Sequence, residues 1–491
     1  MLSQFTVGTI DQLLLMSVKQ KHLFLRHLAF SGKVVVIDEV HANDSFMNQH
    51  LFKALNWLGA YHVPVIALSA TLPKETRVNL LAAYYRGRFG KSIKHAEAPE
   101  NWQETQSYPL LTMLDGKQVK QVTEFGNEQT PVTVKVNRLD QTNEELMNSI
   151  LNKIKKGGIA GIIVDTIREA QELGRLVPDD VPHLVLHSAF LAGERASKEA
   201  TLQEKIGKNG HRPDKMIVIG TQVLEQSLDI DFDVLYTDIA PMDLLLQRIG
   251  RLHRHHIQRP DELRQPEVFI MGIEAFGKYR AGISFIYENY LLMKTDYYLK
   301  DELTLPTDIS PLVQQVYDFE SNEEIPDLKK VKTQFDTHRE KQESEAKAFQ
   351  IGLPKQNCNP IHGWLKHPYD PQNADEKSGA VVRDIQETLE VILVKQIGSE
   401  CFTLSGTRIS DMSDMAIAEQ TIRLPVRVTQ NMGNVVSKLL GQTNRFFANW
   451  KESKWLKESY ALVLDQDQSA ILDGWQLRYS SDWGLSYKKE E

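Results

Sequence analysis

The 491-residue sequence has little of what small secreted proteins and membrane proteins depend on. It has only two cysteines, Cys358 and Cys401, which lie far apart in the chain. A disulfide framework and a cysteine-rich zinc module are therefore excluded, and the composition fits a reducing cytosol. No apolar run approaches about 18 residues, which excludes a membrane-spanning helix of ordinary length. The first twelve residues contain no basic leader, so we expect no signal peptide and a cytoplasmic protein.

A large excess of one charge is also missing. Lys and Arg together number 57 and Asp and Glu number 65, so the net charge is −8. Whole-chain charge therefore gives no argument for nucleic-acid binding, although clustered cations can still provide it locally. Charged residues make up 25% and hydrophobic residues 41%, which is typical of a folded chain with several domains.

Short apolar runs without alternation recur up to about residue 275. They lie at 34–37, 65–68, 159–164, 183–186, 216–219 and 234–236, and polar residues follow each of them. Such runs are typical of parallel strands that are covered on both faces, and ligands bind at the carboxyl ends of strands in these sheets. The sequence therefore predicts an α/β fold with two parallel-sheet domains.

The texture of the sequence divides the chain into five predicted regions. They are an incomplete first parallel-sheet domain at 1–110, connecting strands at 111–143, a second parallel-sheet domain at 144–275, a helical and charged linker at 276–376, and a small accessory domain at 377–491. We expect antiparallel strands within 108–125 and 130–136, further strands at 389–394 and 423–428, and a solvated helix or linker over 321–347.

The strongest chemical signal is the segment 36–41. Asp38 and Glu39 directly follow a buried strand. Because Mg²⁺ prefers oxygen ligands and keeps most of its waters, Asp38 can hold the ion through its water shell. Glu39 can then orient or deprotonate an attacking water, as phosphoryl transfer requires. Taken alone, the motif is equally compatible with a strand end that is capped by solvated acids.

A second motif, Ser69-Ala70-Thr71, follows the next predicted strand. Its small hydroxyl side chains can hydrogen-bond to neighbouring loops and relay a change at a phosphate site. The alternative is an ordinary helix cap ahead of Pro73.

A third motif spans 220–231, where a strand ends in Gly220 and polar residues follow. Glycine permits a tight turn at this point. Thr221 and Gln226 can meet a nucleic-acid backbone, and Asp229 can meet a ribose or the waters bound to a metal ion.

A fourth motif spans 247–256 and is rich in cations. Arg251 and Arg254 are three residues apart, so on a helix they would share one face. Two adjacent guanidinium groups suit the charge of a transferring phosphoryl group. One alternative is a basic helix end that interacts with the helix dipole. A metal site made by the three histidines of this segment lacks supporting carboxylate or cysteine spacing.

The order of these motifs resembles superfamily 2 helicases, which have two RecA-like domains. The strings at 7–12, 38–42, 222–231 and 244–255 are similar, more specifically, to the helicase–nuclease of type I CRISPR systems, in particular the type I-E form. The resemblance implies ATP-dependent 3′-to-5′ movement on single-stranded DNA in antiviral defence. It also implies ATP and Mg²⁺ as cofactors and an RNA-guided surveillance complex as partner.

The same resemblance implies roles for individual residues. Asp38 would bind Mg²⁺, Glu39 would activate water, and Arg251 and Arg254 would act as arginine fingers from the second domain. Further residues would contact the nucleotide, namely His41, Gly220, Asp229 and Gln247. Ser69 and Thr71 would couple the sites, and Thr9, Thr221 and Gln226 would lie along the DNA. One departure is Ala189, where the family usually has a basic residue.

A phosphate-binding loop of the form G-x-x-x-x-G-K-[ST] is missing. Gly90-Lys91-Ser92 is preceded by Tyr85 at the first glycine position, and no His-Asp dipeptide of the family's nuclease domain occurs. We therefore expect the carboxyl-terminal part of a longer protein, inactive and weak in ATP binding alone, whose missing parts a separate chain can supply. Its first sheet should expose an apolar face. The alternatives are an RNA helicase of the same superfamily and a catalytically silent nucleic-acid-binding fragment.

Overall fold

The computed structural model describes residues 3–20, 23–40, 44–126, 130–225, 228–320, 324–354, 382 and 388–490. The chain divides into two compact units. Unit 1 comprises Met1–Thr133, Pro241–Asp243 and Tyr287–Ile385, and unit 2 comprises Val134–Ala240, Leu244–Ile286 and Gln386–Glu491. The predicted α/β class is confirmed, whereas the five regional boundaries stay a prediction.

Unit 1 combines a short parallel sheet with helices and a hairpin. Its elements are α1 (Ile10–Leu14), α2 (Leu23–Phe30), β1 (Val35–Ile37), α3 (Ser45–Ala60), β2 (Val65–Ala67), α4 (Lys74–Phe89), β3 (Leu111–Asp115), β4 (Gln118–Val122), α10 (Asn289–Tyr298), β13 (Glu302–Leu305), α11 (Ile309–Val316) and α12 (Leu328–Phe349). Strands β3 and β4 form the antiparallel pair that we predicted within 108–125. Helix α12 lies where a solvated helix was one of the two expectations.

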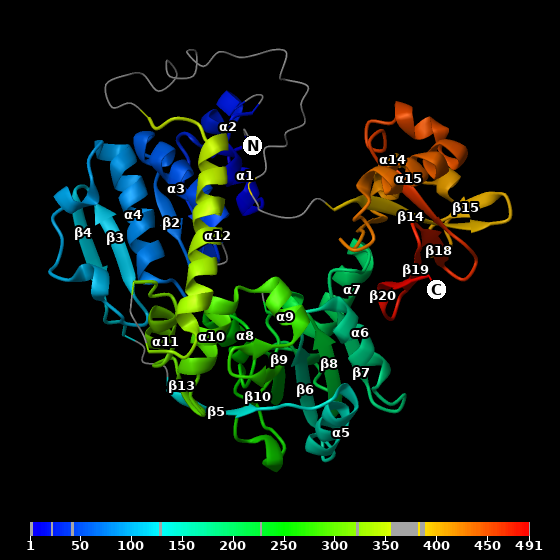
Figure 1. The fold of residues 1–491 in the computed structure, drawn as a ribbon, viewed down its shortest axis with the longest axis horizontal. Coiled ribbons are helices and arrows are strands. Elements are labelled where there is room, and N and C mark those ends of the chain that lie inside the picture. The colour runs from blue at the N-terminus through cyan, green and yellow to red at the C-terminus, as the bar shows by residue number, and fades with distance from the viewer. Residues whose placement is uncertain are drawn as a thin grey trace. The chain divides into compact units, whose positions relative to one another are not determined.

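The core of unit 1 lies between α3, α4 and the β1–β2 sheet. Helix α3 begins where the Asp44 carboxylate accepts a hydrogen bond from the backbone N–H of Met47 (2.7 Å). Helices α3 and α4 lie side by side (Figure 1) because glycines face the opposing backbone. A Cβ atom at Gly59 would lie 2.3 Å from the carbonyl oxygen of Tyr84, and one at Gly87 would lie 1.9 Å from that of Asn56. Larger residues would therefore force the helices apart.

Unit 1 contains a buried histidine, His27, whose burial makes the stability of the fold depend on pH. His27 is 2% exposed, its Nε2 atom lies 2.8 Å from the carbonyl oxygen of Met16, and its Nδ1 atom lies 2.8 Å from the hydroxyl of Tyr61. A neutral ring satisfies both partners, with Nε2 donating and Nδ1 accepting. Burial lowers the pKa of His27 to about 4.

We expect the free energy of unfolding to fall as the pH falls from about 6.5 towards 4, because in this range the unfolded chain binds a proton that the folded ring excludes. The His27 contribution is a loss of about 2 kcal/mol at pH 5. Urea unfolding at about pH 8 and pH 5 measures it. His27→Gln should reduce the difference between the two pH values, and a matched change at the exposed His62 should not. Equal profiles for His27→Gln and the parent chain would contradict the assignment.

Unit 2 contains a parallel sheet and a carboxyl-terminal β-rich part. Apart from the first residues of β5 and α8, its elements are β5 (Val132–Arg138), α5 (Asn143–Lys153), β6 (Gly158–Ile163), α6 (Ile167–Arg175), β7 (His183–Leu186), α7 (Ala192–Ile206), β8 (Lys215–Gly220), β9 (Val234–Asp238), α8 (Met242–Ile249), β10 (Glu267–Met271), β11 (Ile273–Ala275), β12 (Lys278–Tyr279), α9 (Ala281–Ile286), β14 (Glu390–Ile397), β15 (Glu400–Phe402), α14 (Asp414–Ala418), β16 (Thr421–Arg423), α15 (Met432–Phe446), β17 (Tyr460–Leu464), β18 (Ser469–Leu472), β19 (Trp475–Ser480) and β20 (Gly484–Lys489).

The strands of the parallel sheet lie in the order β5-β10-β9-β6-β8-β7 (Figure 1). Strands β6 and β9 are buried along their whole length, as expected for strands that are covered on both faces. One prediction is wrong here. The strand expected at 130–136 is β5, and it pairs parallel with β10, not antiparallel. An apolar run does not encode strand direction, which depends on the distant partner.

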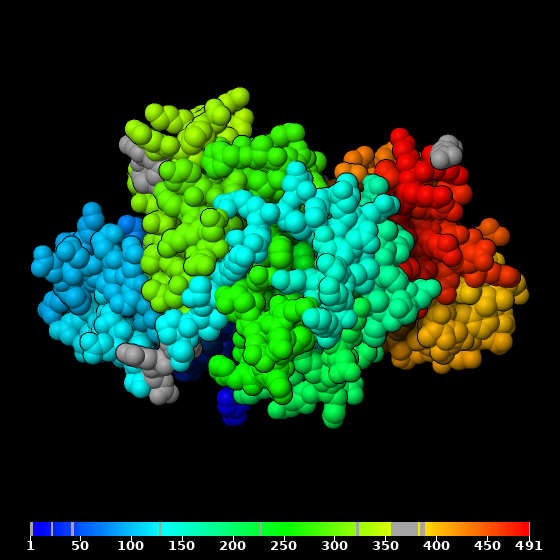
Figure 2. Space-filling view, turned by 90° about the horizontal axis from the view of Figure 1, so that it is seen from below, coloured from blue at the N-terminus to red at the C-terminus, as the bar shows by residue number. Residues whose placement is uncertain are grey.

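The carboxyl-terminal part of unit 2 has its own small sheets. Strand β14 confirms the strand predicted at 389–394 and pairs with β15, β16 and β17. The prediction of a strand at 423–428 is wrong beyond Arg423. Pro425 begins a turn there, and the N–H of Val428 donates to the carbonyl oxygen of Pro425 (2.9 Å). In Figure 2 the residues of this carboxyl-terminal part, coloured yellow-orange to red, gather into one continuous body. Among the described helices, none combines the length and apolarity that crossing a bilayer requires.

Candidate functional site

Asp38 and Glu39 form a tight turn at the carboxyl end of β1. Both are exposed, and one Asp38 carboxylate oxygen accepts a hydrogen bond from the N–H of Glu39 (3.0 Å). Glu39 has a φ of 53°, a left-handed conformation that costs a non-glycine residue about 1 kcal/mol. The buried Val40 anchors the turn, since its N–H donates to the carbonyl oxygen of Leu68 (3.1 Å). The turn therefore presents two carboxylates at the edge of the sheet. His41 lies outside the described residues.

Ser69 and Thr71 lie beside this turn because β1 and β2 pair in parallel. The hydroxyl oxygen of Ser69 accepts a hydrogen bond from the N–H of Thr71 (3.3 Å). Thr71 is buried, and among the described residues its hydroxyl has no hydrogen-bond partner. The structure therefore brings the first two predicted motifs together at one sheet edge.

One face of the β1–β2 sheet is apolar and open. It carries four side chains that are between 47% and 60% exposed, namely Val34, Val36, Ile66 and Leu68. The pairing of Val36 with Ile66 places all four on the same face. The exposed apolar face that we predicted for the first sheet is therefore present in the described part of the chain, and such a face is typical of a surface that another element covers.

Gly220 and Thr221 lie at the carboxyl end of β8 in unit 2. A Cβ atom at Gly220 would lie 2.5 Å from the carbonyl oxygen of Leu186, so glycine allows β7 and β8 to approach closely. Thr221 is almost fully buried, and its N–H donates to the same oxygen (3.3 Å).

Thr9, another predicted nucleic-acid contact, is exposed at the start of α1 in unit 1. Gln226 lies outside the described residues.

The predicted helical placement of Arg251 and Arg254 is wrong, because α8 ends at Ile249. Both arginines instead reach the loop that follows β8. The Arg251 guanidinium donates to the carbonyl oxygens of Leu228 (2.7 Å) and Glu225 (2.5 Å). Backbone contacts, not a shared helix face, therefore position this side chain.

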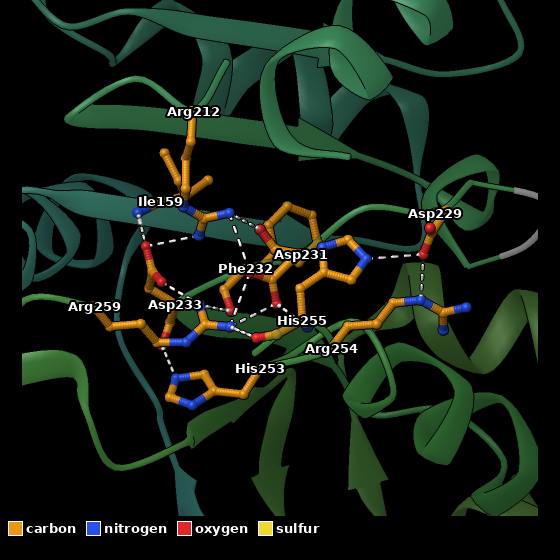
Figure 3. Close-up of polar contacts among 10 residues, drawn as sticks. All are labelled: Ile159, Arg212, Asp229, Asp231, Phe232, Asp233, His253, Arg254, His255 and Arg259. Carbon is orange, nitrogen blue, oxygen red and sulfur yellow. Dashed lines mark hydrogen bonds and ion pairs between the residues drawn. The ribbon is translucent and has the colours of Figure 1, made fainter. Parts of the chain in front are cut away.

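Arg254 pairs with Asp229, another predicted site residue. Its Nε atom donates to the Asp229 carboxylate (2.6 Å), and the Nε2 atom of His255 lies 3.1 Å from the same oxygen (Figure 3). These hydrogen bonds hold the pKa of Asp229 below its usual value. Gln247 lies on α8 and is half-buried. The structure thus groups Arg251, Arg254 and Asp229 around one loop.

Arg248 lies inside the fourth motif, although we predicted no role for it from the sequence. Arg248 is fully buried and donates to the carboxylates of Asp165 (2.8 Å) and Glu225 (2.7 Å), to the hydroxyl of Thr237 (3.0 Å) and to the carbonyl oxygen of Asp238 (3.0 Å). It therefore joins the ends of β6 and β9 to the loop after β8. Acids at the ends of buried apolar runs were the available sequence signal.

A second buried ion-pair cluster was also missed. Asp231 and Asp233 are almost fully buried, and both pair with Arg212 (3.1 and 2.9 Å) and with Arg259. Figure 3 shows the two arginines on either side of the two acids. Arg259 also donates to the carbonyl oxygen of His255 (3.0 Å). The cluster therefore fastens the segment 253–259 to the start of β9.

Two family models match the chain. One, described as CRISPR-associated nuclease/helicase Cas3, C-terminal, matches residues 156–257, and the Cas3 C-terminal domain matches residues 383–485. The CRISPR-associated nuclease/helicase Cas3 of Streptococcus thermophilus is 41% identical over 99% of this chain and 54% of its own length. This chain belongs to the Cas3 family.

Other Cas3 proteins agree with this assignment. The CRISPR-associated endonuclease/helicase Cas3 of Escherichia coli (strain K12) is 29% identical over 89% of this chain and 49% of its own length. A solved structure of T. fusca Cas3-ATP has 26% identity and a TM-score of 0.81 over 98% of this chain and 56% of that one. The chain therefore spans about half the length of these Cas3 relatives.

The Cas3 family implies ATP and Mg²⁺, and the residues present fit one side of such a site. The exposed Asp38 carboxylate is an oxygen donor of the kind that holds Mg²⁺ through water. Glu39 is the adjacent group that can accept a proton. The sequence contains no phosphate-binding loop pattern, so these residues do not provide the cradle for the phosphate groups.

We expect Arg259→Met to lower the free energy of unfolding by about 3–5 kcal/mol, because it removes one of the two arginines that pair with two buried carboxylates. Urea unfolding followed by circular dichroism measures this change. Arg264→Met is the matched control, since Arg264 and its partner Asp261 are both mostly exposed and their pair should contribute less than about 1 kcal/mol. Equal stabilities of the two variants would contradict the importance of the cluster.

Proposed function

We propose that this chain carries the motor part of a Cas3-type helicase, which uses ATP to translocate on single-stranded DNA during CRISPR interference. The proposal rests mainly on one observation. The pair Asp38–Glu39 lies beside Ser69 and Thr71, at the carboxyl edge of the β1–β2 sheet. Solved structures that are similar to this chain support the proposal. They include T. fusca Cas3-ATP and a CRISPR RNA-guided surveillance complex in a pre-nicking state. The type I-E form stays a prediction.

In this proposal each site residue has a chemical task. Bound Mg²⁺–ATP supplies the phosphoryl group that is transferred to water. Asp38 holds the ion through its water shell, and Glu39 orients the attacking water and accepts its proton. The turn that anchors Val40 to Leu68 keeps both carboxylates at the sheet edge. Ser69 and Thr71 couple this edge to the rest of the motor.

Arg251 and Arg254 are proposed to stabilise the negative charge that develops on the transferred phosphate. Arg254 is half-exposed, and within the described contacts only its Nε atom has a partner. Its two Nη groups therefore remain to form a fork onto phosphate oxygens. Gly220, Asp229, Gln247 and His41 complete the proposed nucleotide contacts.

Nucleic acid and a surveillance complex are the proposed partners. Thr9, Thr221 and Gln226 are proposed to contact the backbone of the DNA strand. In this proposal a separate polypeptide supplies the phosphate cradle, whose loop pattern this sequence lacks, and the nuclease chemistry. We propose that such polypeptide covers the open apolar face of β1–β2, since burying four exposed apolar side chains stabilises the complex.

The test is to combine this chain with a Cas3 segment that carries the phosphate loop and to measure ATP hydrolysis with single-stranded DNA or RNA. We expect stimulation by DNA. Stimulation by RNA alone would support an RNA helicase, and DNA binding without any hydrolysis would support a silent binding fragment. Micromolar Mg²⁺-dependent ATP binding by the chain alone would contradict the prediction that the chain binds ATP weakly without a phosphate-binding loop.

A further inference from the structure

Trp455 is exposed on a turn between α15 and β17 in the carboxyl-terminal part of unit 2. Its exposed fraction is 55%. A single exposed apolar residue is common on protein surfaces and needs no explanation. A large, flat aromatic ring that is exposed and has cations nearby in sequence, with no ion pair among the described contacts, is a different case, because both features favour the same ligand.

The backbone of this turn is firmly held. The hydroxyl oxygen of Ser453 accepts hydrogen bonds from the N–H groups of Trp455 (3.1 Å) and Leu456 (3.2 Å), and the hydroxyl itself donates to the Asp414 carboxylate (2.5 Å). Leu456 and Trp450 are buried on either side of the turn. Trp455 therefore points outward from a fixed support, and little further ordering is needed for a ligand to bind it.

Four exposed cations surround the ring in sequence. They are Arg445, Lys451, Lys454 and Lys457. The Nζ atom of Lys454 lies 5.9 Å from the centre of the Trp455 ring. We call these five residues the 445–457 patch. Glu452 is the one acid within the interval, although Glu458 follows it directly.

The cations of the patch differ from others in the same part of the chain. Arg408, Arg423 and Lys438 each pair with an acid, at 2.8, 3.1 and 2.8 Å. Among the described contacts, none of the four patch cations makes an ion pair or a side-chain hydrogen bond. Their charges are therefore available to an anion from outside the chain, although the chain as a whole is acidic.

We propose that the 445–457 patch binds single-stranded nucleic acid, with one base stacked on Trp455 and the flanking cations on neighbouring phosphates. An aromatic ring stacks on any base, and lysines contact phosphates without reading sequence, so the contact is sequence-tolerant. An acidic protein segment would use the cations but not the flat ring. The patch includes none of the proposed nucleotide and DNA residues. The proposal deepens the proposed function by adding a second contact for the strand, and this contact needs no ATP.

The experiment uses the full chain without nucleotide and a labelled oligo-dT of about 20 nucleotides, followed by fluorescence anisotropy at about 50 and 200 mM salt. Trp455→Ala should weaken binding about tenfold, and Trp455→Phe should recover part of the loss because it restores a stacking ring. Lys451→Ala/Lys454→Ala should lower the slope of log affinity against log salt by about 1.4.

Two matched controls come from the same part of the chain. Ile471→Ala removes another exposed apolar side chain, and Lys488→Ala/Lys489→Ala removes two exposed lysines from β20. Both should bind like the parent chain. Circular dichroism shows whether each variant is folded.

The proposal is overturned if the patch variants bind as tightly as the controls, if the parent chain does not bind the oligonucleotide, or if a polyglutamate peptide binds the patch and the oligonucleotide does not. Comparable binding of an oligo-rU supports a contact through bases and phosphates, and a preference for oligo-dT supports DNA as its source. Failure of DNA-stimulated hydrolysis in the combined protein would overturn the motor function alone, since binding to the patch is measured without ATP.

Discussion

Glu39→Gln should reduce ATP hydrolysis by about 10²–10⁴-fold in the protein that is completed with a phosphate loop, whereas nucleotide binding should be nearly unchanged. The amide has almost the shape of the carboxylate, but it cannot accept a proton from water. The turn itself should persist, because the side chain of Asp38 and the backbone of Val40 hold it. Single-turnover hydrolysis and a separate nucleotide titration distinguish chemistry from binding.

A suitable control is Glu75→Gln. Glu75 is another exposed acid of unit 1, located in the first turn of α4. The Glu75→Gln variant should hydrolyse ATP like the parent protein, because the Glu75 carboxylate is not part of the proposed site. Asp38→Asn should instead raise the Mg²⁺ concentration that half-maximal hydrolysis requires. If Glu39→Gln turned over normally, the acidic pair would be a solvated strand end, and the proposed mechanism would fail.

Arg248→Met should lower the free energy of unfolding by about 3–5 kcal/mol. The side chain is fully buried, and its removal leaves the buried carboxylates of Asp165 and Glu225 without their shared cation. Uncompensated buried charge is expensive because the low-dielectric interior cannot solvate it. Burial raises the pKa of the neighbouring Asp238 well above its usual value, which reflects the same poor solvation.

Neutralising the partners tests whether charge is the cause. Adding Asp165→Asn and Glu225→Gln to Arg248→Met should recover part of the lost stability, because the uncompensated charges are then gone. Urea unfolding followed by circular dichroism measures all variants. If the triple variant were no more stable than Arg248→Met, packing and not charge would explain the loss. A loss below about 1 kcal/mol for Arg248→Met would show that the site is hydrated.

Local patterns were enough to predict the fold class and the position of the first chemical motif. Apolar runs without alternation predicted buried parallel strands, and β6 and β9 have this burial. Polar residues directly after such runs have to lie at the carboxyl edge of a sheet, whatever the strand order is. Asp38 and Ser69 therefore lie at the same sheet edge for a reason that the sequence already contained, whereas the pairing of β1 with β2 brings them close together. The roles of these residues in catalysis stay predictions.

The tertiary structure alone decided the direction of β5, the support of Arg251 and both buried ion-pair clusters. The direction of β5 depends on its pairing with β10, more than 100 residues later. Arg212, Asp231 and Arg259 meet because β9 lies between β10 and β6 in the sheet. Charges read along the chain look solvated, and only strand order determines which of them become buried and which partner each then requires. Long-range pairing therefore fixes the polar interior, whereas local apolar patterns fix where strands occur.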